Sequence, residues 1–187
     1  ALTDADQNVA VGNLTLSADT LGSHSVAVGN NALRRQNFTT ATDTYNVAVG
    51  DDAGTQITTG IRNTLVGALA GDALTESLLN VAVGFQSLSA DTLGSRSVAI
   101  GPFALQAQNF TTATSSYNVA VGADAGLLVT TGVRNSLIGG LSGDALTVGS
   151  YNVALGYDAL SADTQGSRNV AIGYGALDDQ NFTSATD

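Results

Sequence analysis

The chain has 187 residues and a net charge of −10, with six basic residues, all of them Arg, against sixteen acidic ones. This charge argues against a nucleic-acid partner, which needs a basic surface, and against binding to an anionic membrane surface. The sequence contains no Cys, which excludes disulfides and thiolate metal sites. It also contains no apolar run of membrane-spanning length, so we expect no membrane insertion.

A five-residue motif recurs along the whole chain, beginning with Asn-Val-Ala-Val-Gly at 8–12. Self-similarity at a fixed period is typical of stacked-repeat proteins. The spacings between the closing glycines of the ten copies are 17, 21, 17, 17, 17, 21, 17, 17 and 17 residues. These glycines are Gly12, Gly29, Gly50, Gly67, Gly84, Gly101, Gly122, Gly139, Gly156 and Gly173.

The spacings themselves repeat every 72 residues, from Gly12 to Gly84 and from Gly84 to Gly156. We therefore interpret 1–187 as a single repeat array built of super-repeats 1–72, 73–144 and 145–187, the last of them incomplete. On this interpretation the chain is a slice of a longer fibre.

The Val-Ala-Val core of the motif favours a β-strand, because β-branched residues suit a pleated surface. Side chains alternate between the two faces of a strand, so the Val columns share one face, and Ala and Asn share the other. The pattern predicts an all-β fold, a parallel β-roll or β-solenoid of about ten stacked coils of 17 or 21 residues. We expect a second short strand in each coil, in the Thr-rich part before the next motif.

Stacking the coils in register would align the motif Asn residues in one ladder along the rod, with Ser25 and Ser97 in the same line. We expect this ladder to be structural, with each amide bonding to the next. Its members are Asn8, Asn46, Asn63, Asn80, Asn118, Asn135, Asn152 and Asn169.

Two motif copies carry Leu65 or Leu137 where the other eight carry Ala. The coils beside these Leu residues have Gly at the fourth position after the motif, where the remaining coils have Leu. Volume lost at one column thus reappears at the other. This predicts that both columns face one shared, closely packed space.

The 21-residue coils contain four extra residues, and an insertion in a solenoid usually forms an outward loop. These loops are candidates for surface binding, although each Phe could instead fold back as a lid on its coil. The candidate residues are Asn37, Phe38, Asn109, Phe110, Asn181 and Phe182.

Catalytic chemistry finds little support in the sequence. His24 is the only histidine, and its column holds Arg in four other coils, so we interpret it as a surface position. A lone His without Cys makes neither a metal site nor a convincing general base. We therefore expect no catalytic, metal or cofactor-binding residues, no cofactor and no enzymatic activity.

The motif copies at 97–101 and 169–173, Ser/Asn-Val-Ala-Ile-Gly, resemble the repeat of trimeric autotransporter adhesin heads. A longer form of the pattern, with a Thr-Gly pair before the next Asn (59–60 and 131–132), resembles repeats of phage tail fibres and related surface proteins. The resemblance implies a trimeric β-roll outside the cell or on a virion, attached to host matrix or cell surfaces. The coils here are longer than those of the adhesin heads.

Both faces of the motif strand are apolar, so a lone rod would expose one apolar stripe along its length. We therefore expect a homotrimer, and we place the Val and Ile columns inside each roll and the Ala column toward the partners.

The expected function is a structural or adhesive fibre segment of a phage tail fibre or bacterial surface adhesin. A host-surface glycan or protein is a further candidate partner. An ice-binding β-solenoid is the alternative, but its Thr array, around Thr58 and Thr130, looks ragged; thermal hysteresis would separate the two. A carbohydrate-active β-helix enzyme is the third reading, and it lacks a recurrent charged cluster.

Overall fold

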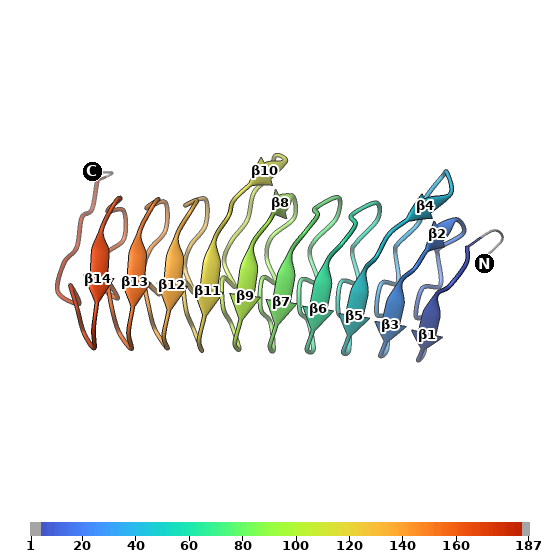
Figure 1. Ribbon diagram of the computed structural model, residues 1–187, viewed down its shortest axis with the longest axis horizontal. Helices are drawn as coiled ribbons and strands as arrows, with labels where there is room; N and C mark the ends of the chain where they lie inside the picture. Colours follow the sequence, from blue (N-terminus) through green and yellow to red (C-terminus); the bar gives the residue numbers. More distant parts are fainter. Residues whose placement is uncertain (1–4, 185–187) are drawn as a thin grey trace.

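The computed structural model describes residues 5–184 and shows a parallel β-solenoid of ten coils, as the sequence predicts (Figure 1). Within these residues no helix is present, and so none that could cross a membrane. Each coil contributes one strand to a ten-stranded sheet. The strands are β1 (Val9–Val11), β3 (Val26–Val28), β5 (Val47–Val49), β6 (Thr64–Val66), β7 (Val81–Val83), β9 (Val98–Ile100), β11 (Val119–Val121), β12 (Ser136–Ile138), β13 (Val153–Leu155) and β14 (Val170–Ile172).

Neighbouring coils pair in exact register, motif against motif. Val9 lies beside Val26 and Ala10 beside Ala27, and the same relation holds for every later pair. All pairs are parallel, because each strand is reached from the preceding one by a full turn of the solenoid. At about 4.8 Å per strand, ten coils form a rod roughly 48 Å long.

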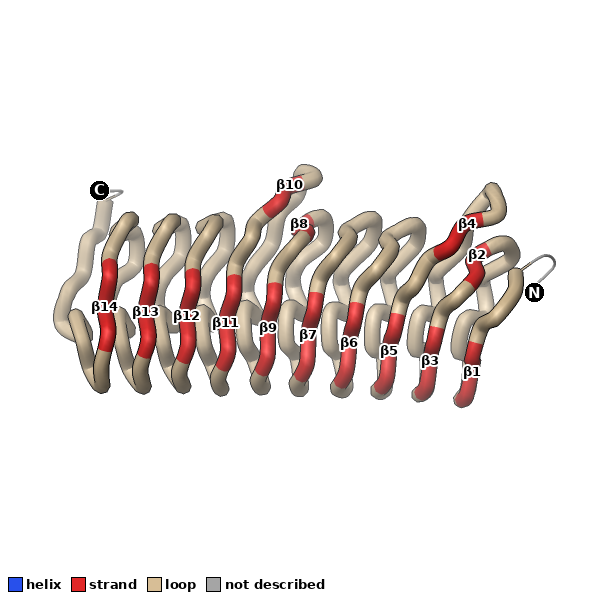
Figure 2. Tube along the Cα trace, viewed as in Figure 1, coloured by secondary structure: helices blue, strands red, loops and turns tan. Residues whose placement is uncertain are grey.

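The second strand that we expected in each coil forms only where a 21-residue coil stacks on its neighbour. There β2 (Gly22–Ser23) pairs with β4 (Thr42–Asp43), and β8 (Gly94–Ser95) pairs with β10 (Thr114–Ser115). The other coils close through turns (Figure 2). Two or three residues per coil adopt a left-handed backbone in addition to the motif glycine, and such residues interrupt any extended run.

Our expectation for the strand faces is wrong, because the Ala column points into the coil. Ala27, Ala82 and Ala99 are completely buried, whereas the Val and Ile side chains beside them lie on the outer face. The space inside a 17-residue coil is thin. A small side chain is needed on the strand because a Leu from the opposite side of the coil, such as Leu33 or Leu88, fills most of it.

The predicted exchange of volume between the two columns is confirmed. A Cβ added to Gly54 would lie 2.7 Å from Cδ1 of Leu65, and one added to Gly71 would lie 2.8 Å from its Cδ2. Leu137 meets Gly126 and Gly143 in the same way, at 2.8 Å in both cases. One Leu on the strand therefore replaces two on the opposite side.

The closing glycine of each motif is required by contact between coils as well as by its backbone. Gly122 has φ +140°, and a Cβ there would lie 2.4 Å from the carbonyl oxygen of Gly139 in the next coil. Nearly the same distance, 2.2–2.5 Å, recurs from Gly12 to Gly156. A column of glycines thus lets successive coils approach at the spacing that the sheet hydrogen bonds demand.

Candidate functional site

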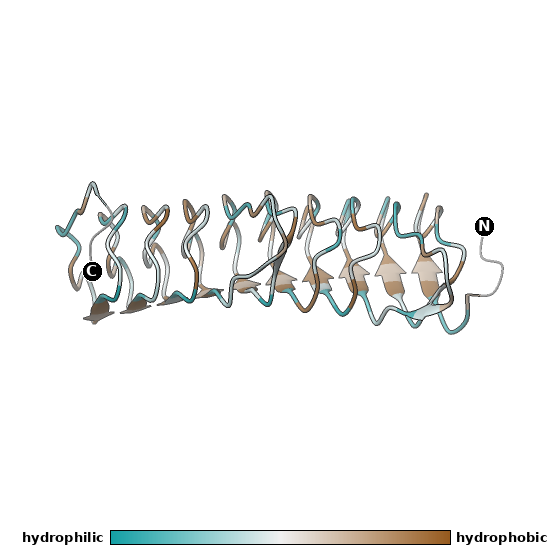
Figure 3. Cartoon of the chain, turned by 90° about the horizontal axis from the view of Figure 1, so that it is seen from above, coloured by the Kyte–Doolittle hydropathy of each residue, from teal (hydrophilic) through white to brown (hydrophobic). Residues whose placement is uncertain are grey.

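The outer face of the ten-stranded sheet is the most extensive apolar surface of the rod. In Figure 3 the motif strands line one long side of the molecule and are coloured mainly as hydrophobic. Two stripes of Val, Ile and Leu run along this face, interrupted only by Thr64 and Ser136 in one stripe. Their most exposed members are Val9, Val11, Val49, Ile100, Ile138, Val153, Leu155, Val170 and Ile172.

The motif Asn side chains lie in one buried line, on the same inward face as the Ala column. The amide oxygen of Asn46 accepts the backbone N–H of Asn63 at 2.9 Å, and the Asn46 amide nitrogen donates to the carbonyl of Gly60 at 2.8 Å. The pattern recurs along the rod. Amide-to-amide bonds are few, so the line joins each side chain mainly to the backbone of the next coil, a detail that the sequence did not reveal.

Replacing one member of this line should leave several buried partners unpaired. Asn118 binds the backbone N–H of Asn135, the carbonyl of Gly132 and the side chain of Gln108. We expect Asn118→Leu to lower the free energy of unfolding by roughly 1–3 kcal/mol, the cost of stranding such groups, measured by denaturant unfolding. Asn30→Leu is the control, since this exposed Asn bonds only to Asp51, and its change should stay within about 0.5 kcal/mol. Equal effects of the two substitutions would contradict a buried structural line.

The Asn line changes at Ser25 and Ser97, and a second buried polar chain fills the gap. Near Ser97, the Gln108 amide donates to the Asp91 carboxylate at 2.6 Å and to the Ser97 hydroxyl at 2.9 Å. Its oxygen accepts from Asn118 at 2.8 Å. Burial raises the pKa of the Asp91 carboxyl above its ordinary value, against the lowering effect of its hydrogen bonds with Gln108, Phe110 and Gly94. This network recurs around Asp19 and Gln36, and it accounts for the 72-residue unit.

The candidate binding loops of the long coils are only partly available. Phe38 and Phe110 are 6% and 7% exposed, which favours the reading of each Phe as a lid over its coil. Phe182, in the last coil, is 39% exposed. The candidate residues Asn37, Asn109 and Asn181 are exposed, and each accepts a hydrogen bond from the Thr hydroxyl of the preceding coil, from Thr20, Thr92 and Thr164 respectively.

The Thr array is more regular than the sequence suggested. Thr58, Thr75 and Thr92 stand in register, as do Thr130, Thr147 and Thr164, joined by backbone hydrogen bonds from coil to coil. Their hydroxyls, however, donate along the rod to the next coil. Thr75 binds the carbonyl of Thr92 at 2.9 Å, for example, and Thr147 that of Thr164 at 2.8 Å. The column therefore acts as a further link between coils, and nothing in it favours the ice-binding alternative.

The residue before each motif Asn forms an exposed edge in which Arg and Tyr alternate from Arg96 to Arg168. The Arg134 guanidinium lies 5.9 Å from the ring centre of Tyr117 and 5.3 Å from that of Tyr151, within reach of cation–π attraction. His24 belongs to the same column. It stacks on Tyr45 and forms an ion pair with Asp43 at 3.0 Å, so it is a half-buried edge residue.

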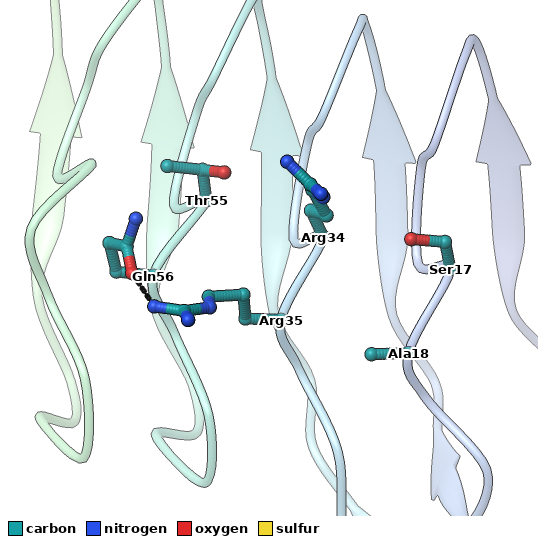
Figure 4. Close-up of a pocket in the computed structure, with 6 residues that line it drawn as sticks. All are labelled: Ser17, Ala18, Arg34, Arg35, Thr55 and Gln56. Carbon is teal, nitrogen blue, oxygen red and sulfur yellow. Dashed lines mark hydrogen bonds between the residues drawn. The ribbon is translucent and has the colours of Figure 1, made fainter.

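A hollow of about 530 Å³ lies over the first three coils, away from the sheet (Figure 4). Two residues from each coil line it: Ser17, Ala18, Arg34, Arg35, Thr55 and Gln56. Arg35 donates a hydrogen bond to the side-chain oxygen of Gln56, drawn as a dashed line in Figure 4. The sequence analysis did not single out these residues, because the paired Arg occurs in only one super-repeat.

Within residues 5–184, no three His, Asp or Glu side chains are grouped so that they could hold a metal ion. Comparison of the chain with protein-family models, with curated proteins and with solved structures gave no match. The case for a function therefore depends on the surfaces described above.

Proposed function

We propose that this chain is a structural segment of an extracellular fibre, of the kind found in phage tail fibres and bacterial surface adhesins. In this role three copies form a stiff rod that holds or presents a surface-attachment site. The proposal is supported by the outer face of the sheet, where two apolar stripes continue over all ten coils. Soluble monomers rarely leave so long an apolar surface uncovered.

Three copies can cover this face if their sheets turn toward a common axis. Closed cyclic symmetry is the usual arrangement of homo-oligomers, and the resemblance to trimeric adhesin heads favours three copies over two. The orientation is opposite to the one we expected from the sequence, since Val and Ile, and not Ala, lie on the outer face. The acidic, polar remainder of the surface would stay in contact with water and keep the fibre soluble.

The assembly state tests this proposal. We expect light scattering to give three times the chain mass of 18.7 kDa. Ile138→Glu together with Ile100→Glu should yield monomers, because six carboxylates would meet at the axis without partners. The far-ultraviolet circular dichroism spectrum should not change, since both side chains point away from the core.

Leu128→Glu is the matched control, because Leu128 is 48% exposed and lies outside the sheet, on the segment between the buried Gly126 and Val129. It should leave the trimer intact. A wild-type chain that is monomeric, stable and soluble at micromolar concentration would overturn the proposal.

A further inference from the structure

We propose that the hollow beside Arg34 and Arg35 binds a surface glycan that ends in one acidic sugar. The choice of a surface glycan rests on the proposed role in attachment, whereas the preference for an anion rests on the hollow itself. Its volume of about 530 Å³ lies within the range of small-molecule sites, about 300–1,000 Å³.

The side chains of the hollow offer hydrogen-bond donors in excess. Arg34 and Arg35 bring two guanidinium groups, Ser17 and Thr55 bring hydroxyls, and Gln56 brings an amide. The bond from Arg35 to Gln56 holds one guanidinium in place across two coils. Guanidinium groups suit a carboxylate because they donate two parallel hydrogen bonds to it, and the hydroxyls and the amide suit the neighbouring sugar hydroxyls.

The two arginines also have no internal reason for their charge. Within residues 5–184, no carboxylate forms an ion pair with Arg34 or Arg35, although the chain carries sixteen acidic residues. A charge placed only for stability would ordinarily be expected beside one of them. Both side chains are exposed instead, and they flank an open space.

Comparison with the second super-repeat separates what the coil needs from what the hollow adds. The buried residues on either side keep their character, with Leu105 for Leu33, Gln108 for Gln36 and Val129 for Ile57. Four of the six lining residues differ, and all four lose their charge or become less polar. Gln106, Ala107, Leu127 and Leu128 stand in place of Arg34, Arg35, Thr55 and Gln56. The solenoid therefore forms without this polar set.

The surroundings favour a single negative charge on the ligand over a long polyanion. The next coil places Asp72 at the position of Thr55, and the chain as a whole carries −10, so an extended polyanion would meet repulsion beyond the hollow. The site also stays open in the proposed trimer. Leu33 and Gln36 point into the core opposite the strands, so Arg34 and Arg35, which lie between them, face away from the sheet.

The test is a titration of the full chain with 3′-sialyllactose, followed by nuclear magnetic resonance, with lactose and inorganic sulfate as separate probes. We expect binding of sialyllactose, and binding of lactose or sulfate at least tenfold weaker. Arg34→Gln with Arg35→Ala copies the second super-repeat, so the variant should fold normally and lose at least tenfold in affinity.

A converse variant guards against an indirect effect. Gln106→Arg, Ala107→Arg, Leu127→Thr and Leu128→Gln rebuild the hollow 72 residues further on and should double the number of sialyllactose molecules bound per chain. Equal binding of lactose, equal binding of sulfate, binding of heparin fragments alone, or wild-type affinity in the Arg34→Gln/Arg35→Ala variant would each overturn the proposal. Light scattering on the same samples judges the trimer separately, since a monomer that binds would contradict only the assembly.

Discussion

Gly122→Ala is expected to destabilise the solenoid by more than about 4 kcal/mol, combining backbone strain with a steric clash. At φ +140° an Ala is strained, and its Cβ would lie 2.4 Å from the Gly139 carbonyl oxygen. The obstacle is backbone, which cannot rotate away as a side chain can. The two coils would have to separate and give up the hydrogen bonds between them. Thermal and denaturant unfolding, followed by circular dichroism, measure the loss.

Two other glycines separate the contributions of strain and clash. Gly173 has φ +123° but no neighbour within 4 Å of the added Cβ, so Gly173→Ala should cost only the strain, roughly 1–3 kcal/mol. Gly140→Ala, in an ordinary backbone conformation and 3.4 Å from the Tyr157 ring, should be close to neutral. Similar losses for Gly122→Ala and Gly173→Ala would show that contact between coils does not require glycine.

The second large effect is a coupling between Leu137 and Gly126. Leu137→Ala should cost roughly 2–5 kcal/mol, as expected for a fully buried Leu. Gly126→Leu alone should cost roughly 1–3 kcal/mol, because its Cβ would lie 2.8 Å from Leu137 Cδ1. Together they recreate the Ala and Leu arrangement of other coils. Leu88 has nearly the same left-handed backbone as Gly126, with φ +52° against +61°, so the exchange fits the backbone.

The double variant should therefore be more stable than the sum of the two changes predicts, by at least about 1 kcal/mol. Gly54→Leu combined with Leu137→Ala is the control. Gly54 meets Leu65 in the first super-repeat and not Leu137, so these effects should add. Additivity in both pairs would mean that the two columns do not share one space.

The sequence was sufficient for the coil count, the parallel register and the packing between Leu65 and its glycines, because each depends on columns that repeat. It misled us on the strand faces, where we placed the larger Val inside. The exchange of Leu65 with Gly54 and Gly71 already contained the answer, since only residues facing the core trade volume with one another.

Other features could not be read from one chain. Asp91 and Gln108 look like surface residues, and only the stacking of coils shows that they bond to each other in the core. The same holds for the hollow. Ser17, Arg34 and Thr55 are separated by 17 and 21 residues and become neighbours only because those are the coil lengths.

The coil lengths also determine how the fibre responds to tension. Each coil contacts only the coils above and below it, so a pull along the rod detaches the end coil while the others keep their bonds. Releasing 17 residues lengthens the chain by roughly 55 Å, and releasing 21 by roughly 70 Å. A stretched fibre thus yields in steps whose sizes follow the order 17, 21, 17, 17, and it absorbs work coil by coil without breaking at one point.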